Sequence, residues 1–275
     1  IINALFDKGP KDEKVLGKGV YKNFGIAKNG FNIISTQFAL HYFFENKHTC
    51  NAFLRNVSEC CKVGGYFIGT CYDGKKIFRL LEEKKQGESI SKLNKGQKIW
   101  EVEKMYDKND FNDNETSFGY AINVYQESIN KTFKEYLVNF NYLSILLENY
   151  GFAKVTDTEA RELGLGHSVT SFSDYFTMMQ NEITSNERVN NAYGNSAKMS
   201  PEEKFVSFLN NCFVFKKIRN VDEVNIEKIF TNETVIQEKE TIYETKKIQN
   251  SSKNATKNKS IATKLKKKIK LVMNE

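Results

Sequence analysis

A run of polar and aromatic side chains follows a short apolar stretch in the first quarter of the chain. Gln37, Phe38, His41 and Tyr42 come directly after residues 31–36, whose bulky apolar side chains predict a buried central strand. In an open α/β sheet, ligands bind just past the carboxyl ends of the strands. Amide, imidazole and aromatic groups at that place suit a planar ligand that forms hydrogen bonds. The segment therefore predicts a binding site for such a ligand.

A helix and a second strand are the elements that must position this cluster. Residues 46–62 carry apolar side chains at helical spacing, which predicts a helix with one apolar face. Gly64 and Gly65 are expected to end this helix and turn the chain. Residues 66–70 predict the next buried strand. Strand, helix, paired glycines and strand in this order predict the second half of a doubly wound α/β sheet with helices on both faces.

The remaining segments give a mixed pattern. Residues 17–30 are expected to form a surface loop. Residues 86–116 are polar and rich in Gly, Asn and Asp, which predicts a mobile excursion with only a small strand near 99–102. The further expected elements are a strand at 120–125, a helix at 142–150, a strand at 152–155, helices near 173–180 and from Pro201 onward, and a closing strand at 212–217.

Composition limits the class of protein. The chain has 275 residues, enough for one sizeable domain or one domain with a tail. None of its five cysteines forms a Cys-x-x-Cys pair and only three histidines occur, so we expect no metal site. The odd cysteine count favours reduced, buried thiols in a cytosol-like compartment. The first ten residues have neither a basic start nor a long apolar run, so we expect no signal peptide and no membrane partner.

The net charge of +7 is spread unevenly along the chain. Residues 219–275 hold 13 of the Lys and Arg but only 8 of the Asp and Glu, which gives this segment a charge of +5. The weak hydrophobic pattern of residues 219–275 predicts a charged, Lys-rich, disordered tail. Residues 1–218 are then expected to form a partial folded domain. A basic tail can bind a polyanion such as RNA, although a solubilising end is the simpler interpretation.

Two segments together resemble a known family. FNIISTQFALHYFFE, residues 31–45, followed by GGYFIGTCYDG, residues 64–74, resembles the mRNA cap guanine-N7 methyltransferases. The loop at 4–21 is similar to the capping enzymes of large cytoplasmic DNA viruses, and the whole likeness covers residues 1–218. The resemblance implies the C-terminal part of a class I, Rossmann-like sheet that uses S-adenosylmethionine, from the methyltransferase domain of a capping enzyme. The N-terminal strands of that sheet are then expected to be missing.

The resemblance also implies roles for single residues. Gln37 and Tyr42 would lie against the cofactor, S-adenosylmethionine, and His41 and Tyr42 would line the pocket of the cap guanine. Glu135, in EYLVNF, would bond the edge of the guanine. A tyrosine that touches the cap in cellular members is replaced here by Asn210, which makes this substrate contact the weakest of the set. No residue is implied as a general base.

The resemblance places other parts of the site outside the chain. The glycine loop that binds the cofactor, the acid that holds its ribose and the basic contacts to the cap phosphates are expected before Ile1. The implied partners are capped mRNA and other capping-enzyme domains on the same chain, with no membrane and no metal. The implied location is the cytoplasm, in a viral factory or virion, for a viral protein, and the nucleus for a cellular one.

Methylation of guanine N7 needs alignment rather than a proton acceptor. N7 already carries a lone pair, so catalysis can rest on holding donor, methyl and nitrogen in a line and away from water. The methylated ring is positively charged, which an acid such as Glu135 and a stacked ring such as Tyr42 would stabilise. A carboxylate can also accept hydrogen bonds from guanine N1–H and the exocyclic amine.

Each of these residues has a simpler structural interpretation as well. His41 could be a satisfied core histidine, Gln37 could cap backbone groups, Tyr42 could pack in the core, and Glu135 could be a solvated charge. For the chain as a whole, two other functions stay open. One is a non-catalytic RNA-binding or stimulatory module with a methyltransferase-like fold, and the other is an S-adenosylmethionine-dependent methyltransferase for another substrate.

Overall fold

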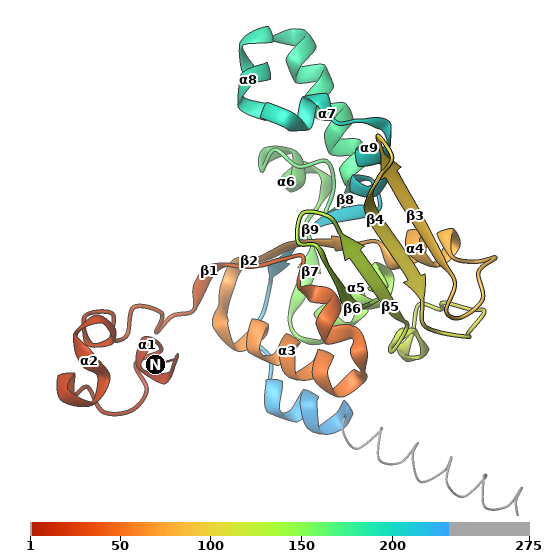
Figure 1. Ribbon diagram of the computed structural model, residues 1–275. Coiled ribbons are helices and arrows are strands. Elements are labelled where there is room, and N and C mark those ends of the chain that lie inside the picture. Colours follow the sequence, from red (N-terminus) through yellow and green to blue (C-terminus); the bar gives the residue numbers. More distant parts are fainter. Residues whose placement is uncertain (1, 231–275) are drawn as a thin grey trace, which may run out of the picture. The chain divides into compact units, whose positions relative to one another are not determined.

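The computed structural model describes residues 2–230, which form a five-stranded main sheet, a four-stranded small sheet and helices around them (Figure 1). The main sheet contains β1 (Phe31–Gln37), β2 (Cys61–Tyr72), β7 (Phe152–Lys154), β8 (Val169–Ser171) and β9 (Asn210–Lys217). The small sheet contains β3 (Ser89–Asn94), β4 (Gln97–Lys104), β5 (Ala121–Gln126) and β6 (Lys131–Tyr136). The labelled α-helices are α1 (Ile2–Leu5), α2 (Glu13–Lys22), α3 (Lys47–Cys60), α4 (Gly74–Leu80), α5 (Phe140–Asn149), α6 (Asp157–Glu162), α7 (Phe172–Ser185), α8 (Asn190–Tyr193) and α9 (Pro201–Ser207), and residues 223–230 are helical as well. The 3₁₀ helices are η1 (Leu40–Glu45), η2 (Glu115–Ser117), η3 (Glu187–Val189) and η4 (Gly194–Lys198).

The main sheet has the strand order β1-β2-β9-β7. Strands β1 and β2 are parallel and are joined by α3, because parallel neighbours need a crossover connection. Strand β9 runs antiparallel to β2 and pairs with β7 at one end and with β8 at the other. The predicted α/β class and the predicted strands at 31–36, 66–70, 152–155 and 212–217 are confirmed.

The helix between β1 and β2 begins and ends as its sequence dictates. The Asn46 side chain caps it by accepting from Thr49 N–H, and its buried face carries apolar side chains at helical spacing. The helix ends at Cys60, and β2 starts directly after it. The prediction that Gly64 and Gly65 end the helix was wrong. Both lie inside β2, where the pairing with β1 is irregular and a Cβ on Gly65 would lie 2.9 Å from the Asn32 carbonyl oxygen.

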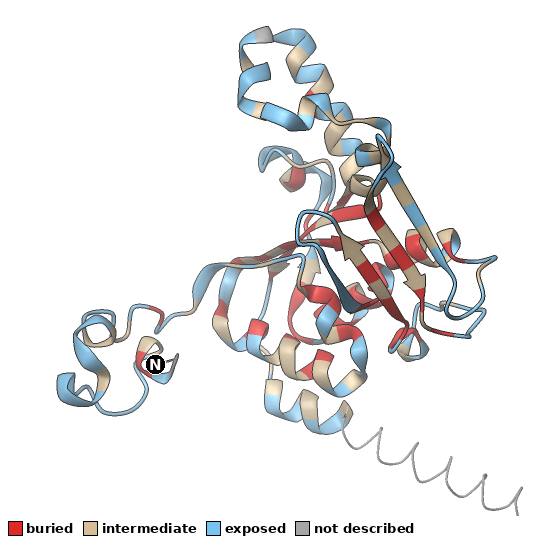
Figure 2. Cartoon of the chain, in the orientation of Figure 1, coloured by how far each residue is buried: buried red, intermediate tan, exposed pale blue. Residues whose placement is uncertain are grey.

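Aromatic side chains join the main sheet to the helices on one of its faces. Phe53 of α3 packs on Phe67 of β2 with ring centroids 6.0 Å apart, and Phe140 of α5 packs on Phe213 of β9 at the same centroid distance. On the opposite face α6 is tied to the sheet by Tyr66, whose hydroxyl donates to Glu159 at 2.7 Å. Figure 2 shows buried residues where the sheets and these helices meet, and exposed residues along α2 and α8.

The small sheet replaces the mobile excursion that was predicted for residues 86–116. Strands β3 and β4 form a hairpin whose two turn residues, Lys95 and Gly96, both have positive φ, as two-residue hairpin turns require. Along β4 the side chains alternate, so that Trp100 and Val102 are buried in a core shared with Tyr72 at the end of β2. The prediction of an irregular excursion was therefore wrong, whereas the strands predicted near 99–102 and at 120–125 are confirmed as β4 and β5. The small sheet packs on the main one through this core.

The ends of the chain differ from expectation or lie outside the described residues. Residues 13–22 form α2, with a kink at Gly17, in place of part of the expected surface loop. The chain divides into two units, Ile1–Glu227 and Lys228–Glu275. The expected tail, 219–275, lies mostly outside the described residues, so its disorder stays a prediction. In the described part, no helix is long and apolar enough to span a bilayer.

The edge of the main sheet is formed by β1. Within the described residues β1 pairs only with β2, so it is an edge strand where a central strand was predicted, and its Ile33 side chain is 58% exposed.

Gly69→Ala is expected to destabilise the chain by at least about 1–3 kcal/mol. A Cβ on Gly69 of β2 would lie 2.1 Å from the Thr36 carbonyl oxygen and 2.5 Å from the Phe213 ring, so β1 and β2 would have to separate. Gly19→Ala in α2 is the matched control, because a Cβ there meets no atom within 4 Å. The free energy of unfolding in urea measures both variants. Equal stability of the two would contradict this packing.

Candidate functional site

The carboxyl end of β1 leads through a strained residue into η1. Phe38 follows β1 with φ of 50°, in the left-handed region that residues other than glycine rarely adopt. Its backbone N–H donates to the Thr70 carbonyl at 2.8 Å, which ties this turn to the end of β2. Its ring is 53% exposed. Backbone strain of this kind concentrates at functional sites, and here it directs the chain into the segment that bears His41 and Tyr42.

His41 of η1 meets Glu135 of β6. The two residues are far apart in sequence, yet His41 Nδ1 lies 3.7 Å from Glu135 Oε2. Both side chains are buried, and neither His41 Nε2 nor Glu135 Oε2 has a hydrogen-bond partner among the described residues. Buried polar atoms in proteins are nearly always hydrogen-bonded. One unsatisfied atom on each of two neighbouring buried side chains therefore points to a ligand that supplies the missing partners.

Burial also sets the charges of this pair. It raises the pKa of Glu135 to about 7 and lowers the pKa of His41 to about 4. At neutral pH the imidazole is therefore uncharged and the carboxyl group is only partly ionised. The 3.7 Å contact is then neither an ion pair nor a hydrogen bond. A carboxyl group held near its ionisation point in a buried position is typical of a functional site.

Two tyrosines flank the buried pair. The ring centroid of Tyr42 is 4.2 Å from that of His41, and Tyr42 is 45% exposed, so it forms the outer wall of the site. Tyr72, at the end of β2, is buried, and its oxygen accepts from Trp100 Nε1 at 2.9 Å and from Gln126 Nε2 at 3.4 Å. Burial, and then the charge of Glu135, raise the pKa of Tyr72 to about 12 and also raise the pKa of Tyr42. Both phenols therefore keep their protons at neutral pH.

Asn210 lies directly opposite Tyr72 in the β2–β9 pairing. Its Nδ2 donates to the carbonyl oxygens of Val206 at 3.3 Å and Ser207 at 3.1 Å, which fixes the orientation of the amide. Its Oδ1 is buried and has no partner among the described residues. Asn210 thus presents a hydrogen-bond acceptor next to the site.

A cavity of about 500 Å³ lies between the small sheet, α9 and the turn after β1. Its walls include Phe38, Tyr72, Trp100, Phe172 and Asn210. Ligand sites of small organic molecules have volumes in this range and are mostly apolar with a few directed polar groups. His41, Tyr42 and Glu135 do not line this cavity, but Tyr72 does, and the charge of Glu135 raises the pKa of Tyr72, which connects the cavity to the buried pair.

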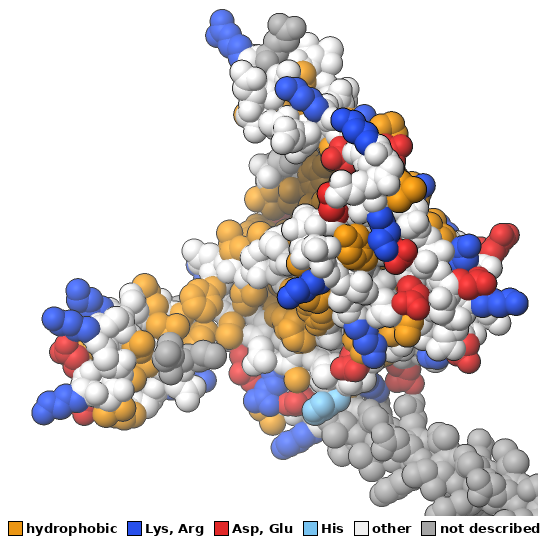
Figure 3. Space-filling model, in the orientation of Figure 1, with side chains coloured by type: hydrophobic (Ala, Val, Ile, Leu, Met, Phe, Trp, Pro, Cys, Tyr) orange, Lys and Arg blue, Asp and Glu red, His pale blue; other side chains and the backbone are white. Residues whose placement is uncertain are grey.

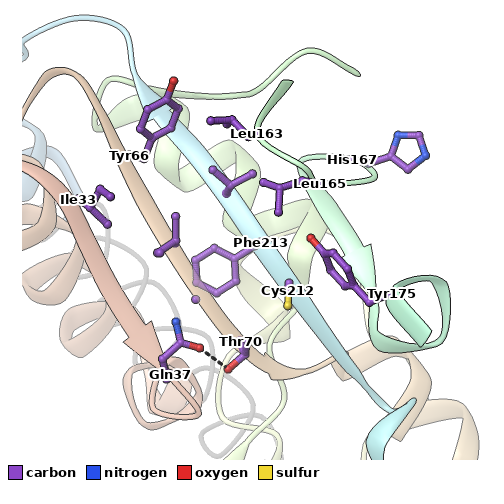
Figure 4. A pocket seen from close by; sticks show the side chains of 13 residues that line it. Ile33, Gln37, Tyr66, Thr70, Leu163, Leu165, His167, Tyr175, Cys212 and Phe213 are labelled. Carbon is purple, nitrogen blue, oxygen red and sulfur yellow. Dashed lines mark hydrogen bonds between the residues drawn. The ribbon is translucent and has the colours of Figure 1, made fainter. Parts of the chain in front are cut away.

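Gln37 is placed differently from the other predicted site residues. Its Oε1 accepts from Thr70 Oγ1 at 2.8 Å (Figure 4). Its Nε2 donates to Ser35 Oγ at 2.9 Å. It lines a second cavity, of about 470 Å³, whose other walls include Tyr66 and Tyr175. Figure 3 shows hydrophobic side chains gathered in the hollow below α7. The structure thus brings His41, Tyr42 and Glu135 together, with Asn210 nearby, and leaves Gln37 on another cavity.

The sequence analysis did not single out Tyr72. The signal was present, because Tyr72 follows the strand predicted at 66–70, at the carboxyl end where ligand-binding residues of α/β sheets occur. In the part of the chain that the structure describes, no three His, Cys, Asp or Glu side chains gather closely enough to hold a metal ion.

Comparison with known proteins assigns the segment that carries this site. Residues 13–218 match the mRNA (guanine-N(7))-methyltransferase domain family. An mRNA cap guanine-N(7) methyltransferase from Candida glabrata is 27% identical over 192 residues, which cover 68% of this chain and 44% of that protein. A probable mRNA-capping enzyme of Acanthamoeba polyphaga mimivirus is 29% identical over 161 residues, covering 56% of this chain and 13% of that protein.

The chain spans less than half the length of these two relatives. Among solved structures, an S-adenosylmethionine-dependent methyltransferase from Clostridium acetobutylicum matches with a TM-score of 0.35 and 12% identity, covering 68% of this chain and 58% of that one.

Glu135→Gln is expected to stabilise the folded chain above pH 7. Because the pKa of Glu135 rises from its ordinary 4.5 to about 7 on folding, the wild type loses stability as pH rises through this window. The loss is on the order of 1–3 kcal/mol and should be absent in the variant, which has no proton to release. Unfolding in urea near pH 5 and near pH 8 measures it, with exposed Glu162→Gln as control. The same pH dependence in wild type and Glu135→Gln would contradict the burial of an unpaired carboxyl group.

Proposed function

The chain belongs to the mRNA (guanine-N(7))-methyltransferase family, and from this we propose that it binds the cap guanine of capped mRNA and presents its N7 for methyl transfer from S-adenosylmethionine. The observation that carries the proposal is the buried pair His41 and Glu135, with one unsatisfied polar atom on each. Both residues lie within the matched segment.

The pair complements the Watson–Crick edge of guanine. Guanine N1–H and its exocyclic amine are two adjacent donors, which an ionised Glu135 carboxylate can accept together. Guanine O6 is an acceptor, and a neutral His41 ring offers one N–H donor. The low pKa of His41 keeps this ring neutral at physiological pH, so it does not compete with guanine for the charge of Glu135. A bound guanine would therefore satisfy the atoms that the folded chain leaves unpaired.

The site favours the charge that the reaction creates. N7 attacks with its own lone pair, so no side chain has to remove a proton, and none near the pair is proposed as a general base. Methylation leaves the purine positively charged. The ionised Glu135 stabilises that charge strongly because its carboxylate is buried, where charges are weakly screened. The exposed Tyr42 ring can stabilise the same charge by a cation–π contact.

Gln37 and Tyr42 are the residues that we propose for contact with S-adenosylmethionine, which supplies the methyl group when bound. Gln37 fits this role because it is exposed at the carboxyl end of β1 and its amide is held in place by Ser35 and Thr70. Tyr42 is exposed in η1, which follows the same turn. Asn210, through its unsatisfied Oδ1, is proposed as a further substrate contact.

The partners and the location of the whole protein are proposals of the same kind. Capped mRNA is the proposed substrate, and other capping-enzyme domains on the same polypeptide are proposed because one relative is named as a capping enzyme and is far longer than this chain. The proposed location is the cytoplasm, in a viral factory or virion, for a viral protein and the nucleus for a cellular one.

Glu135→Gln and His41→Ala should each weaken binding of the cap analogue GpppA at least about tenfold while the fold is kept. Each variant removes a buried hydrogen bond to guanine, and bonds to a charged partner contribute about 1.5–3 kcal/mol. Isothermal titration of the 275-residue chain measures the affinity. The controls are His48→Ala, at an exposed position, and Glu101→Gln, which removes the carboxylate that pairs with Lys98 on the small sheet. Both should bind as the wild type does.

Wild-type affinity in both site variants would refute the pocket assignment. Methyl transfer to capped RNA, assayed with S-adenosylmethionine on this chain and on the longest protein that contains it, separates the enzyme from its alternatives. Cap binding without transfer in either form would favour a non-catalytic RNA-binding module. Transfer to an acceptor other than capped RNA would favour a methyltransferase for another substrate.

Binding of GpppA should strengthen as pH rises from about 6 to 8. Guanine binds the ionised carboxylate, and the pKa of Glu135 in the free chain is about 7, so each pH unit below this value weakens binding by up to about tenfold. Glu135→Gln should lose this dependence. Titrations at several pH values test it, and a wild-type affinity that stays constant across the range would contradict the assigned role.

A further inference from the structure

The face of β6 that bears Glu135 continues outward from the buried pair. Side chains alternate across a strand, so Lys131 and Phe133 share the face of Glu135. Their cross-strand partners in β5 are Gln126, Val124 and Ile122. Directly opposed residues share a face, and Val124 and Ile122 are buried in the core that contains Tyr72, which confirms the face on which these side chains lie. Thr132 and Lys134 lie on the opposite face.

Exposure increases along this face. Glu135 is 7% exposed, Phe133 is 37% exposed, and Lys131 is exposed. Alternate residues of a strand are about 7 Å apart. A carboxyl group at the bottom, an aromatic ring above it and an ammonium group at the rim therefore follow one another in a line out of the site.

These three groups suit the kinds of group that a capped RNA presents. The carboxylate suits the edge of a base, an exposed ring suits stacking on a base of any type, and a lysine suits a phosphate. Among the ion pairs between described residues, none includes Lys131, so its charge is available for a ligand. Lys134, on the opposite face, instead lies 5.3 Å from the centroid of the Tyr136 ring.

We propose that this face of β6 is the path by which the RNA chain leaves the guanine site, with Phe133 stacked on a nucleobase and Lys131 bound to a phosphate. The proposal rests on the proposed function, since the line starts at Glu135. It adds a contact site for the RNA beyond the cap guanine. The phosphate can belong to the triphosphate bridge or to the RNA chain, and the test below distinguishes these sources.

Lys131→Ala tests the phosphate contact, with Lys134→Ala as the control of equal charge on the same strand. The ligand is a capped RNA of about ten nucleotides, titrated between about 50 and 200 mM salt. Loss of one phosphate contact should make the slope of log affinity against log salt shallower by about 0.7 in Lys131→Ala, and Lys134→Ala should keep the wild-type slope. The same titration with GpppA locates the phosphate: an effect with both ligands places it in the bridge, and an effect with the RNA alone places it in the chain.

Phe133→Ala tests the stacking contact. Truncation of a stacked ring weakens single-strand binding by about fivefold to hundredfold, so the capped RNA should bind more weakly by this factor. Phe133→Tyr keeps the ring and should retain wild-type affinity. Circular dichroism of both variants shows whether the overall fold is kept, and the two lysine variants test the path independently of Phe133.

The outcomes separate this proposal from the proposed function. One outcome overturns the β6 path and leaves the guanine site intact. In it, the wild type prefers capped over uncapped RNA, Lys131→Ala and Lys134→Ala show the same salt slope, and Phe133→Ala binds the capped RNA as tightly as the wild type. A wild type that binds capped and uncapped RNA equally overturns the guanine site itself. Selective effects of Lys131→Ala and Phe133→Ala on a cap-dependent wild type support the path.

Discussion

A carboxyl group buried without a hydrogen-bond partner is the constraint on which the rest of this structure depends. Burying such a group costs free energy, and the elevated pKa of Glu135 is the direct sign of that cost. The neighbouring His41 does not offset it, because its ring is neutral and its Nδ1 lies beyond hydrogen-bond distance. An arrangement that lowers stability in this way is retained where a ligand makes use of it.

Segments from different parts of the chain are needed to create this environment. The strained turn at Phe38 brings η1 off the end of β1, and the small sheet carries β6 to the same place. Tyr72 and Asn210, paired across β2 and β9, close the side that faces the cavity. The antiparallel small sheet therefore has a positional role: without it, Glu135 would be the solvated charge that its neighbours in the sequence indicate.

The parts of the fold with strong local patterns could be predicted from the sequence. Strand β1, helix α3 and strand β2 follow from apolar runs and helical spacing, and Pro201 begins α9 with a capping box, as its neighbours favour. Strands near 99–102 and at 120–125 were predicted, but β3, β6 and their assembly into a small sheet were not, because β3 and β4 are mostly polar and their apolar residues Trp100 and Val102 become buried only when β5 packs beside them. The same holds for the site. The resemblance to a family named His41, Tyr42 and Glu135, but the burial that leaves them unpaired, and the position of Tyr72 beside them, arise only from tertiary packing.

The central claim is that Glu135 and His41 read the edge of a guanine, and discrimination between guanine and adenine tests it most directly. Adenine presents an acceptor at N1 and a donor at position 6, so both residues would face the wrong group. Parallel titrations of the chain with GpppA and ApppA near pH 8 measure the difference. This account predicts that GpppA binds at least about tenfold more tightly, because each mismatched buried group costs about 1–3 kcal/mol. Equal affinity for the two dinucleotides would contradict it.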